Sequence, residues 1–169
     1  DVGCFDGKFL RSLGGAWEKY GIEINKAAAS HAEGCGIEIV GEDWMQLEHI
    51  QQEFNVVVAT DVIEHVENPA LFLSLLSNAI NPGGSIFIST GNTEALSWRF
   101  LGSRYWYSAI AEHISFINPT WCRYFAREYG LYVDQIRFFS HGDRAFTRRI
   151  SESILNFIYY FSPKLFALI

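Results

Sequence analysis

Residues 54–90 read FNVVVATDVIEHVENPALFLSLLSNAINPGGSIFIST, and this stretch decides the fold class. Its first seven residues are apolar and rich in β-branched side chains, which is typical of a strand buried on both faces. Asn68 and Pro69 form the pattern of a helix start, and the apolar residues that follow fall on one stripe. The turn residues 81–84 end this helix, and residues 85–90 form a second apolar run. A strand, a helix and a strand in this order predict two parallel strands.

Strands and helices alternate along the rest of the chain as well. The expected strands cover residues 19–24, 37–40, 54–60 and 85–90, and the expected helices cover residues 8–13, 26–33, 69–80 and 119–130. Residues 131–139 and 145–149 are predicted to form a hairpin around a short polar turn. This alternation predicts an α/β fold with a mostly parallel sheet.

Composition excludes several classes of protein. The 169 residues and the hydrophobic content of 49% suit one domain with a single core. A charged fraction of 19% beside 16% aromatic residues excludes a disordered chain, and a net charge of −6 argues against nucleic-acid binding. The cysteines Cys4, Cys35 and Cys122 have no CxxC spacing, so we expect neither disulfides nor a metal site. Free thiols favour a reducing compartment, and we expect a cytoplasmic protein.

Both ends of the chain are unusual. The glycine-rich loop (residues 1–7) opens the sequence, although such a loop normally follows a buried strand. We therefore expect a truncated first strand, with further residues before it. Residues 154–169 are strongly apolar and follow several arginines. We expect one domain over residues 1–150 and a helical tail over residues 151–169. The tail would pack on the domain or on a second subunit of a homodimer; peripheral contact with a membrane is the alternative.

Ligands of parallel α/β sheets bind at the carboxyl ends of the strands, where this sequence gathers acidic residues. The glycine-rich loop lacks the GxGxxG and GK[ST] patterns that hold a pyrophosphate or a nucleoside triphosphate. Glu23 ends the next strand, about 20 residues further on, where an acidic side chain binds two ribose hydroxyls. Asp1 and residues 42–44 add further acceptors. Together they predict an adenosine ligand with a positive charge and no phosphate, which describes S-adenosylmethionine.

Four motifs then resemble those of class I S-adenosylmethionine-dependent methyltransferases. Residues 1–7 (DVGCFDG) resemble motif I, residues 58–66 (VATDVIEHV) the fourth-strand motif, and residues 76–88 (LSNAINPGGSIFI) the segment before the fifth strand. Residues 112–117 (EHISFI) are similar to a stretch of the subgroup that acts on small molecules and envelope saccharides. The resemblance covers about residues 1–140. It implies a Rossmann-like, doubly wound, mostly parallel sheet of seven strands that ends in an antiparallel hairpin.

The chain departs from the family pattern at two positions. Phe5 occupies the place of the middle glycine of motif I, so a bulky side chain is expected beside the cofactor. Ala111 stands where the subgroup often has proline.

The resemblance also implies the residues of the cofactor site. Gly3 and Gly7 would give the backbone room beside the methionine part of the cofactor, whose ammonium group Asp1 would hold. Glu23 would bind the ribose hydroxyls, and Asp43 or its neighbour Glu42 would accept from the adenine amino group. The residues expected to contact S-adenosylmethionine are Asp1, Gly3, Cys4, Phe5, Gly7, Glu23, Ile24, Asp43, Trp44, Thr60, Asp61 and His65.

Methyl transfer to a hydroxyl is helped by a general base, for which histidine is the usual residue. His113 is the first candidate because it follows the variable segment after the fifth strand, and His65 is the second. A hydrogen-bonded loop anchor at His113 and a packed core histidine at His65 are the alternatives. Glu64 and Asp61 are expected either in the site or as caps of the following turn. The other histidines are expected on surface helices or turns: His31, His49 and His141.

Residues 98–107 (WRFLGSRYWY) combine aromatic side chains with two arginines. Aromatic faces suit sugar rings, and arginines suit phosphates or carboxylates, so this segment would form a lid or an acceptor pocket. A hydrophobic cover over the sheet is the alternative.

The sequence therefore predicts methyl transfer from S-adenosylmethionine to a hydroxyl oxygen of a small-molecule or saccharide-type acceptor, with S-adenosylhomocysteine as product. A catalytically silent binding module of the same fold is the alternative. A nicotinamide-dependent oxidoreductase is disfavoured because the pyrophosphate loop is absent.

Overall fold

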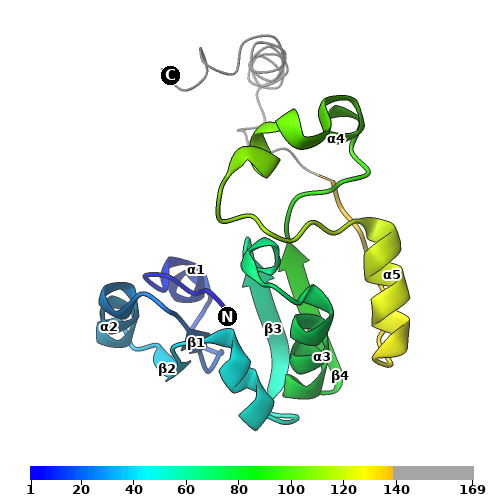
Figure 1. Ribbon diagram of the computed structural model, residues 1–169. Coiled ribbons are helices and arrows are strands. Elements are labelled where there is room, and N and C mark those ends of the chain that lie inside the picture. Colours follow the sequence, from blue (N-terminus) through cyan, green and yellow to red (C-terminus); the bar gives the residue numbers. More distant parts are fainter. Residues whose placement is uncertain (139–169) are drawn as a thin grey trace.

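A parallel sheet organises residues 1–138, the part of the chain that the computed structural model describes (Figure 1). Strand β1 (Tyr20–Ile22) pairs with β2 (Glu38–Gly41), and β3 (Phe54–Thr60) pairs with β4 (Ile80–Ser89). Val2 joins the two pairs through parallel bridges to Ile22 and Ala59. The resulting order is β2–β1–Val2–β3–β4, the order of a doubly wound, Rossmann-like sheet in which the first strand is reduced to Val2.

The central unit of the fold is β3–α3–β4, as residues 54–90 predict. Helix α3 (Pro69–Ala79) begins where Asn68 accepts a hydrogen bond from the backbone N–H of Leu71 at 3.0 Å, with proline at the first helical position. The helix buries Phe72 and Leu76 completely against the sheet. Burial of this apolar face is the driving force that docks the helix across the two strands.

Strand β4 starts earlier than predicted. It begins at Ile80 and includes the turn residues 81–84, which the sequence analysis placed before the strand. The register with β3 is irregular there, between Phe54 and Val56. Gly83 has a φ of 83°, and a Cβ on Gly84 would lie 2.9 Å from the carbonyl oxygen of Asn55. The two glycines therefore bring a bulged backbone into the ladder instead of ending it.

The first half of the domain has a smaller apolar cluster than the second half. The buried residues of its main helix are alanines. Helix α1 (Lys8–Ser12) follows the glycine-rich loop, and α2 (Lys26–Gly34) follows β1. Asn25 caps α2, as predicted, by accepting hydrogen bonds from the N–H groups of Ala27 and Ala28. A small apolar cluster joins the two helices to β2: Cys4, Leu10, Ala32 and Ile37. Short turns of 3₁₀ helix follow β2 and β3, as η1 (Trp44–His49) and η2 (Ile63–His65).

The segment after β4 holds helices that the sequence analysis did not identify. These are α4 (Leu96–Leu101), η3 (Gly102–Arg104) and η4 (Trp106–Ala109). Figure 1 places them beyond the carboxyl ends of β3 and β4. Helix α5 (Pro119–Glu128) then returns alongside α3, and it begins at its predicted cap, where Asn118 accepts from the N–H of Trp121 at 2.7 Å. The 90–118 segment therefore covers the edge where ligands of this fold bind.

The predicted hairpin lies mostly outside the described residues. Residues 131–138 are irregular and pair with no strand of residues 1–138, and their predicted partner, residues 145–149, is not described. The N–H of Leu131 bonds the carbonyl of Ala126 at 2.7 Å and terminates α5. Residues 139–149, the domain boundary at 150, the tail and His141 lie outside the described residues, as does the rest of the predicted seven-stranded sheet.

No helix among residues 1–138 combines the length and apolarity needed to cross a bilayer.

A matched pair of leucines on α3 tests the described core. Leu76 is fully buried, whereas Leu71 on the same helix is 38% exposed. Leu76→Ala should lower the free energy of unfolding by about 2–5 kcal/mol because it removes buried methyl groups and leaves a cavity. Leu71→Ala, the control, should change it by less than about 1 kcal/mol. Urea unfolding measures both, and equal effects would contradict the described orientation of α3.

Candidate functional site

The glycine-rich loop turns sharply at the carboxyl edge of the sheet. Gly3, Phe5 and Gly7 have φ values of 75°, 49° and 72°, all in the left-handed region. A Cβ on Gly3 would lie 2.6 Å from Cγ2 of Val62, and one on Gly7 would overlap the side chain of Ile37. Both positions therefore need glycine for conformation and for space. Phe5 adopts the same conformation with its side chain 62% exposed.

The other residues of this loop take part mainly through their backbone. The thiol of Cys4 is buried in the small apolar cluster, so only its main chain is available to a ligand in this loop. The carbonyl of Asp1 accepts from the N–H of Ile22 at 3.0 Å, and the N–H of Val2 donates to the carbonyl of Val58 at 2.8 Å. These bonds tie the start of the loop to both neighbouring strands.

Glu23 is a buried carboxylate at the end of β1, with an exposed fraction of 6%. Its Oε2 accepts from the N–H of Phe5 at 2.8 Å, and its Oε1 accepts from the N–H of Asn25 at 2.7 Å. No salt bridge with Glu23 is found within residues 1–138. A carboxylate has about four acceptor positions, so about half of them remain for a ligand. This capacity fits two ribose hydroxyls, the role that the sequence analysis gives to Glu23.

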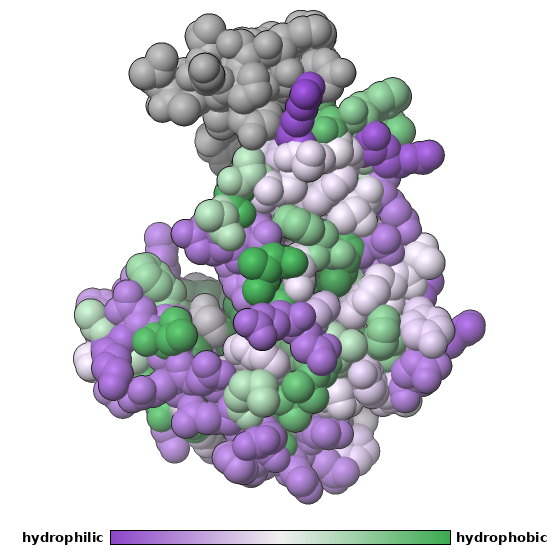
Figure 2. Space-filling model, viewed as in Figure 1, coloured by the Kyte–Doolittle hydropathy of each residue, from purple (hydrophilic) through white to green (hydrophobic). Residues whose placement is uncertain are grey.

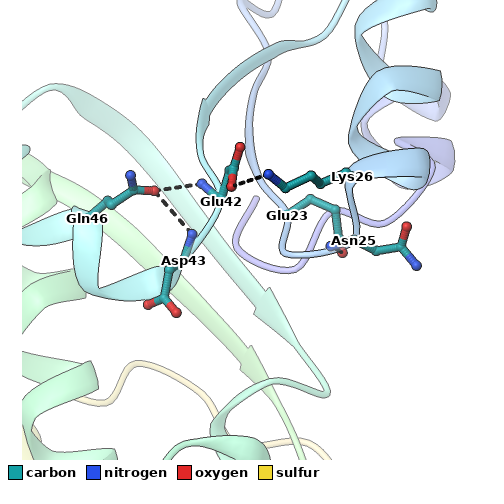
Figure 3. Close-up of polar contacts among 6 residues, drawn as sticks. All are labelled: Glu23, Asn25, Lys26, Glu42, Asp43 and Gln46. Atoms are coloured by element: carbon teal, nitrogen blue, oxygen red, sulfur yellow. Dashed lines mark hydrogen bonds and ion pairs between the residues drawn. The ribbon is translucent and has the colours of Figure 1, made fainter.

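The loop after β2 faces the loop after β1 (Figure 3). The amide oxygen of Gln46 accepts from the N–H groups of Glu42 at 2.6 Å and Asp43 at 3.1 Å. Asp43 caps η1 through a 2.8 Å bond from the N–H of Met45. Lys26 lies 3.4 Å from Glu42 and links the two loops across the gap. The side chain of Asp43 therefore holds this loop through the capping box of η1, and the sequence analysis expects the adenine amino group at the same residue.

The two apolar residues predicted at the adenine occupy different environments. Ile24, next to Glu23, is 75% exposed and offers an open apolar face. The ring of Trp44 packs edge-on against Phe72, with 5.3 Å between centroids, as part of the main core. The side chain of Trp44 therefore supports the fold, which leaves its main chain for the contact with adenine that the sequence analysis expects.

Two histidines from distant parts of the chain meet above the end of β3. The rings of His65 and His113 are 4.8 Å apart and nearly perpendicular. Nδ1 of His65 lies 3.0 Å from the carbonyl oxygen of Glu112, and Nδ1 of His113 lies 2.8 Å from that of Tyr107. A carbonyl can only accept, so each Nδ1 carries the proton. In the neutral form of each ring, Nε2 then carries the lone pair that a general base requires.

His65 is exposed and therefore not the packed core histidine of the alternative interpretation. His113 does anchor its loop by a hydrogen bond, so its two interpretations are compatible. Thr60 and Asp61 lie at the same edge, and Asp61 has a φ of 53° and donates its N–H to the carbonyl of Ser89 at 2.9 Å.

Sequence reasoning named Glu64 only as a residue of the site or a cap of the following turn and missed its two hydrogen-bond partners. Glu64 is completely buried, and its carboxylate accepts hydrogen bonds from the hydroxyls of Tyr107 and Thr90, the latter at 3.0 Å. Burial and the bond to Glu64 raise the pKa of Tyr107 well above its ordinary value, so its hydroxyl remains a donor. The signal available in the sequence was the position of this glutamate in the largely apolar segment 62–66, which indicates a buried carboxylate. Its partners lie 26 and 43 residues away, which no local pattern reveals.

Glu64, His65 and His113 each offer a ligand atom within 4.8 Å of the others, a spacing that a metal ion also requires. Both oxygens of Glu64 already accept hydroxyl groups. Like Glu23, Glu64 keeps about half of its acceptor positions, so its two hydrogen bonds do not decide between a hydrogen-bonded cluster and a metal site.

The remaining histidines of the described region lie elsewhere. His31 is on α2, 3.8 Å from the thiol of Cys35, and His49 lies 3.2 Å from Glu48 on η1. Both are exposed, as predicted.

Aromatic rings form a wall over the histidines. Trp98 contacts Phe116 with ring centroids 4.9 Å apart and Tyr105 at 5.2 Å, and Tyr107 contacts His113 at 4.3 Å. Figure 2 shows apolar side chains gathered in the middle of this face, near the strand ends, with a hydrophilic surface over the α1–α2 half. The contact of Tyr107 with His113 thus places the wall beside the histidine pair.

A family model described as "Methyltransferase domain" matches residues 1–136. The mitochondrial ubiquinone biosynthesis O-methyltransferase of Dictyostelium discoideum is 37% identical over 126 residues, which are 62% of this chain and 39% of that protein. The corresponding protein of Aeromonas salmonicida is 31% identical over 134 residues, covering 70% of this chain and 56% of the relative. The chain therefore spans about half the length of the relatives it matches.

Solved structures show the same fold. An S-adenosylmethionine-dependent methyltransferase from Mesorhizobium loti superposes with a TM-score of 0.65 and 17% identity, covering 91% of this chain and 82% of the other. One from Archaeoglobus fulgidus gives a TM-score of 0.64 and 18% identity, with 94% and 76% covered.

Two glycines test the constraint on the first loop. Gly7→Ala should destabilise the protein by at least about 1–2 kcal/mol, because alanine resists the left-handed conformation and overlaps Ile37. Gly34, at the end of α2, has no atom within 4 Å of its Cβ position. Gly34→Ala, the control, should leave stability unchanged or raise it by up to about 1 kcal/mol. Thermal unfolding of both variants measures the difference, and an equally stable Gly7→Ala would refute the described loop.

Proposed function

The chain belongs to the methyltransferase domain family, as its motifs predict, and on that premise we propose that it transfers a methyl group from S-adenosylmethionine to a hydroxyl oxygen of a small aromatic molecule. The observation that carries this proposal is the pair of histidines, each with Nδ1 held by a carbonyl, beside a loop and a carboxylate shaped for an adenosine.

The residues of the loops at this edge of the sheet fit S-adenosylmethionine. Glu23 keeps acceptor positions for the two ribose hydroxyls, and the exposed Ile24 gives the adenine an apolar face. Asp43, which caps η1, would accept from the adenine amino group. Gly3 and Gly7 leave the backbone bare beside the methionine part, where Asp1, Thr60 and Asp61 supply polar groups. The bound cofactor would supply a methyl group already activated by a sulfonium.

The protein's own part in the reaction is to align the acceptor and to remove its proton. Alignment of reacting groups is worth up to about 7–11 kcal/mol of the barrier in well-oriented reactions. His113 takes the hydroxyl proton at Nε2 and is held in place by its bond to Tyr107. His65 occupies the same tautomer at a ring distance of 4.8 Å and is the second base or the orienting partner.

The aromatic wall favours a phenolic acceptor. Rings of Trp98, Tyr105 and Phe116 suit a flat aromatic molecule, and a phenol loses its proton to imidazole more readily than an aliphatic alcohol. The matched relatives carry the name O-methyltransferase. A saccharide, which also stacks on aromatic faces, is the second acceptor class.

A silent binding module remains the second candidate function, and Phe5 favours it. Its exposed ring stands in the loop where the family pattern has glycine. Cofactor binding without turnover on any phenol or saccharide would support this alternative.

Glu23→Gln tests the cofactor site. The amide NH₂ of glutamine would oppose the N–H groups that now bond the carboxylate, and one acceptor oxygen is lost. Affinity for S-adenosylhomocysteine, measured by calorimetry, should fall at least tenfold. Glu33→Gln on the exposed side of α2 is the matched control and should bind as the wild type does. Equal affinity of all three proteins would remove Glu23 from the site.

His113→Gln tests the base. Turnover on the best acceptor of a phenol and saccharide panel should fall about 10²–10⁴-fold, with affinity for S-adenosylhomocysteine unchanged. His49→Gln, a surface variant, is the control and should retain full turnover. Retained turnover in His113→Gln would shift the role of base to His65, and a loss of cofactor affinity in that variant would show a structural role instead.

A further inference from the structure

We propose that Glu64 is a positioning residue that holds His113 in its Nδ1–H tautomer by fixing both ends of the segment that carries this histidine. The inference rests on the proposed function for the importance of His113, but it is argued from contacts that do not depend on it.

The carboxylate of Glu64 fixes the first end. It accepts the hydroxyl of Tyr107 on one oxygen and that of Thr90 on the other. The phenol oxygen of Tyr107 in turn accepts from the N–H of Gly91 at 3.1 Å. A Cβ on Gly91 would overlap the ring of Tyr107, so the ring lies directly on the backbone that leaves β4. Tyr107 is therefore held by bonds on both sides of its hydroxyl and by close packing.

The backbone of Glu64 fixes the second end. Its carbonyl oxygen accepts from the N–H of Ile114 at 2.9 Å and of Ser115 at 3.0 Å. The hydroxyl of Ser115 adds a 2.6 Å bond to the carbonyl of Val66. His113 immediately precedes this anchored pair. One residue of η2 thus binds the chain before and after the histidine.

Both imidazoles take their orientation from the same segment. Tyr107 supplies the carbonyl that accepts from Nδ1 of His113, and Glu112 supplies the carbonyl for His65. The ring of Tyr107 also packs on that of His113, with centroids 4.3 Å apart. If the phenol moved, the carbonyl and the ring contact would move with it. The carboxylate of Glu64 is therefore linked to the imidazole of His113 through Tyr107 alone. The hydroxyl of Tyr107 donates to Glu64, and its carbonyl accepts from Nδ1 of His113.

Stability alone does not explain a carboxylate at this position. Glu64 lies between the buried side chains of Ile63 and Val66 and is fully excluded from solvent. A buried carboxylate costs free energy even when it is hydrogen bonded, and an apolar side chain of similar volume normally packs there at no loss. What an apolar residue cannot do is orient two hydroxyl groups at once.

The experiment measures the tautomeric state of His113 by two-bond ¹H–¹⁵N NMR. The protein carries ¹⁵N in its five histidines and is saturated with S-adenosylhomocysteine. Tyr107→Phe and Glu64→Gln are compared with Tyr124→Phe, which changes an exposed tyrosine on α5. The wild type and Tyr124→Phe should show one ring with Nδ1 protonated for His113. The two test variants should show mixed tautomers, at a cofactor affinity within about threefold of the wild type. His113→Gln assigns the resonance.

Three outcomes test the positioning role of Glu64. An unchanged tautomer in Tyr107→Phe overturns the proposal, and this variant decides alone if Glu64→Gln does not fold. Loss of the wild-type signature on treatment with EDTA, with recovery on Mg²⁺ or Zn²⁺, also overturns it, because Glu64 would then be a metal ligand. A mixed tautomer in the variants, together with full turnover by His113→Gln, supports the positioning role and refutes the proposed base instead.

Discussion

The backbone ladder through Val2 is the constraint on which the rest of the site depends. By bridging Ile22 on one side and Ala59 on the other, Val2 places the ends of β1 and β3 at one edge, on either side of the glycine-rich loop. Parallel strands end at the same edge, so the ladder alone brings Glu23, the glycine-rich loop and the segment after β3 to one edge of the sheet. Side chains then refine a geometry that the ladder has already set.

Two buried carboxylates carry out that refinement in the same way. Glu23 accepts from two backbone N–H groups and holds the glycine-rich loop against β1. Glu64 accepts from two hydroxyls and holds the 107–115 segment above β3. Neither has an ion-pair partner within residues 1–138. Neutral donors direct the oxygens of a carboxyl group without bringing a positive charge into the site.

Prediction from sequence succeeded where the signal was local. Residues 54–60, the stripe on α3 and the caps at Asn25, Asn68 and Asn118 depend on neighbours within a few positions, and the structure agrees with them. The helices of the 90–118 segment were missed because they are short and aromatic, with no clear period. The hairpin over residues 131–149 stays a prediction, because its second strand lies outside the described residues. Glu64 was only half recognised, since its meaning comes from Tyr107 and Thr90, far away in the sequence.

Phe5 is the position where the fold departs most from the family pattern, and its surroundings argue that the site is maintained. A side chain in the left-handed region costs about 1–2 kcal/mol relative to glycine, so the loop relaxes unless something holds it. The bond from the N–H of Phe5 to Glu23 does so, and the bends at Gly3 and Gly7 leave the residue little other choice. In a loop that no longer bound a ligand, nothing would require Phe5 to stay in a strained conformation. Nor would anything require its N–H to stay bonded to Glu23, a buried carboxylate with vacant acceptor positions. The strain therefore favours a site that still binds its cofactor, a property that the enzyme and the silent module share.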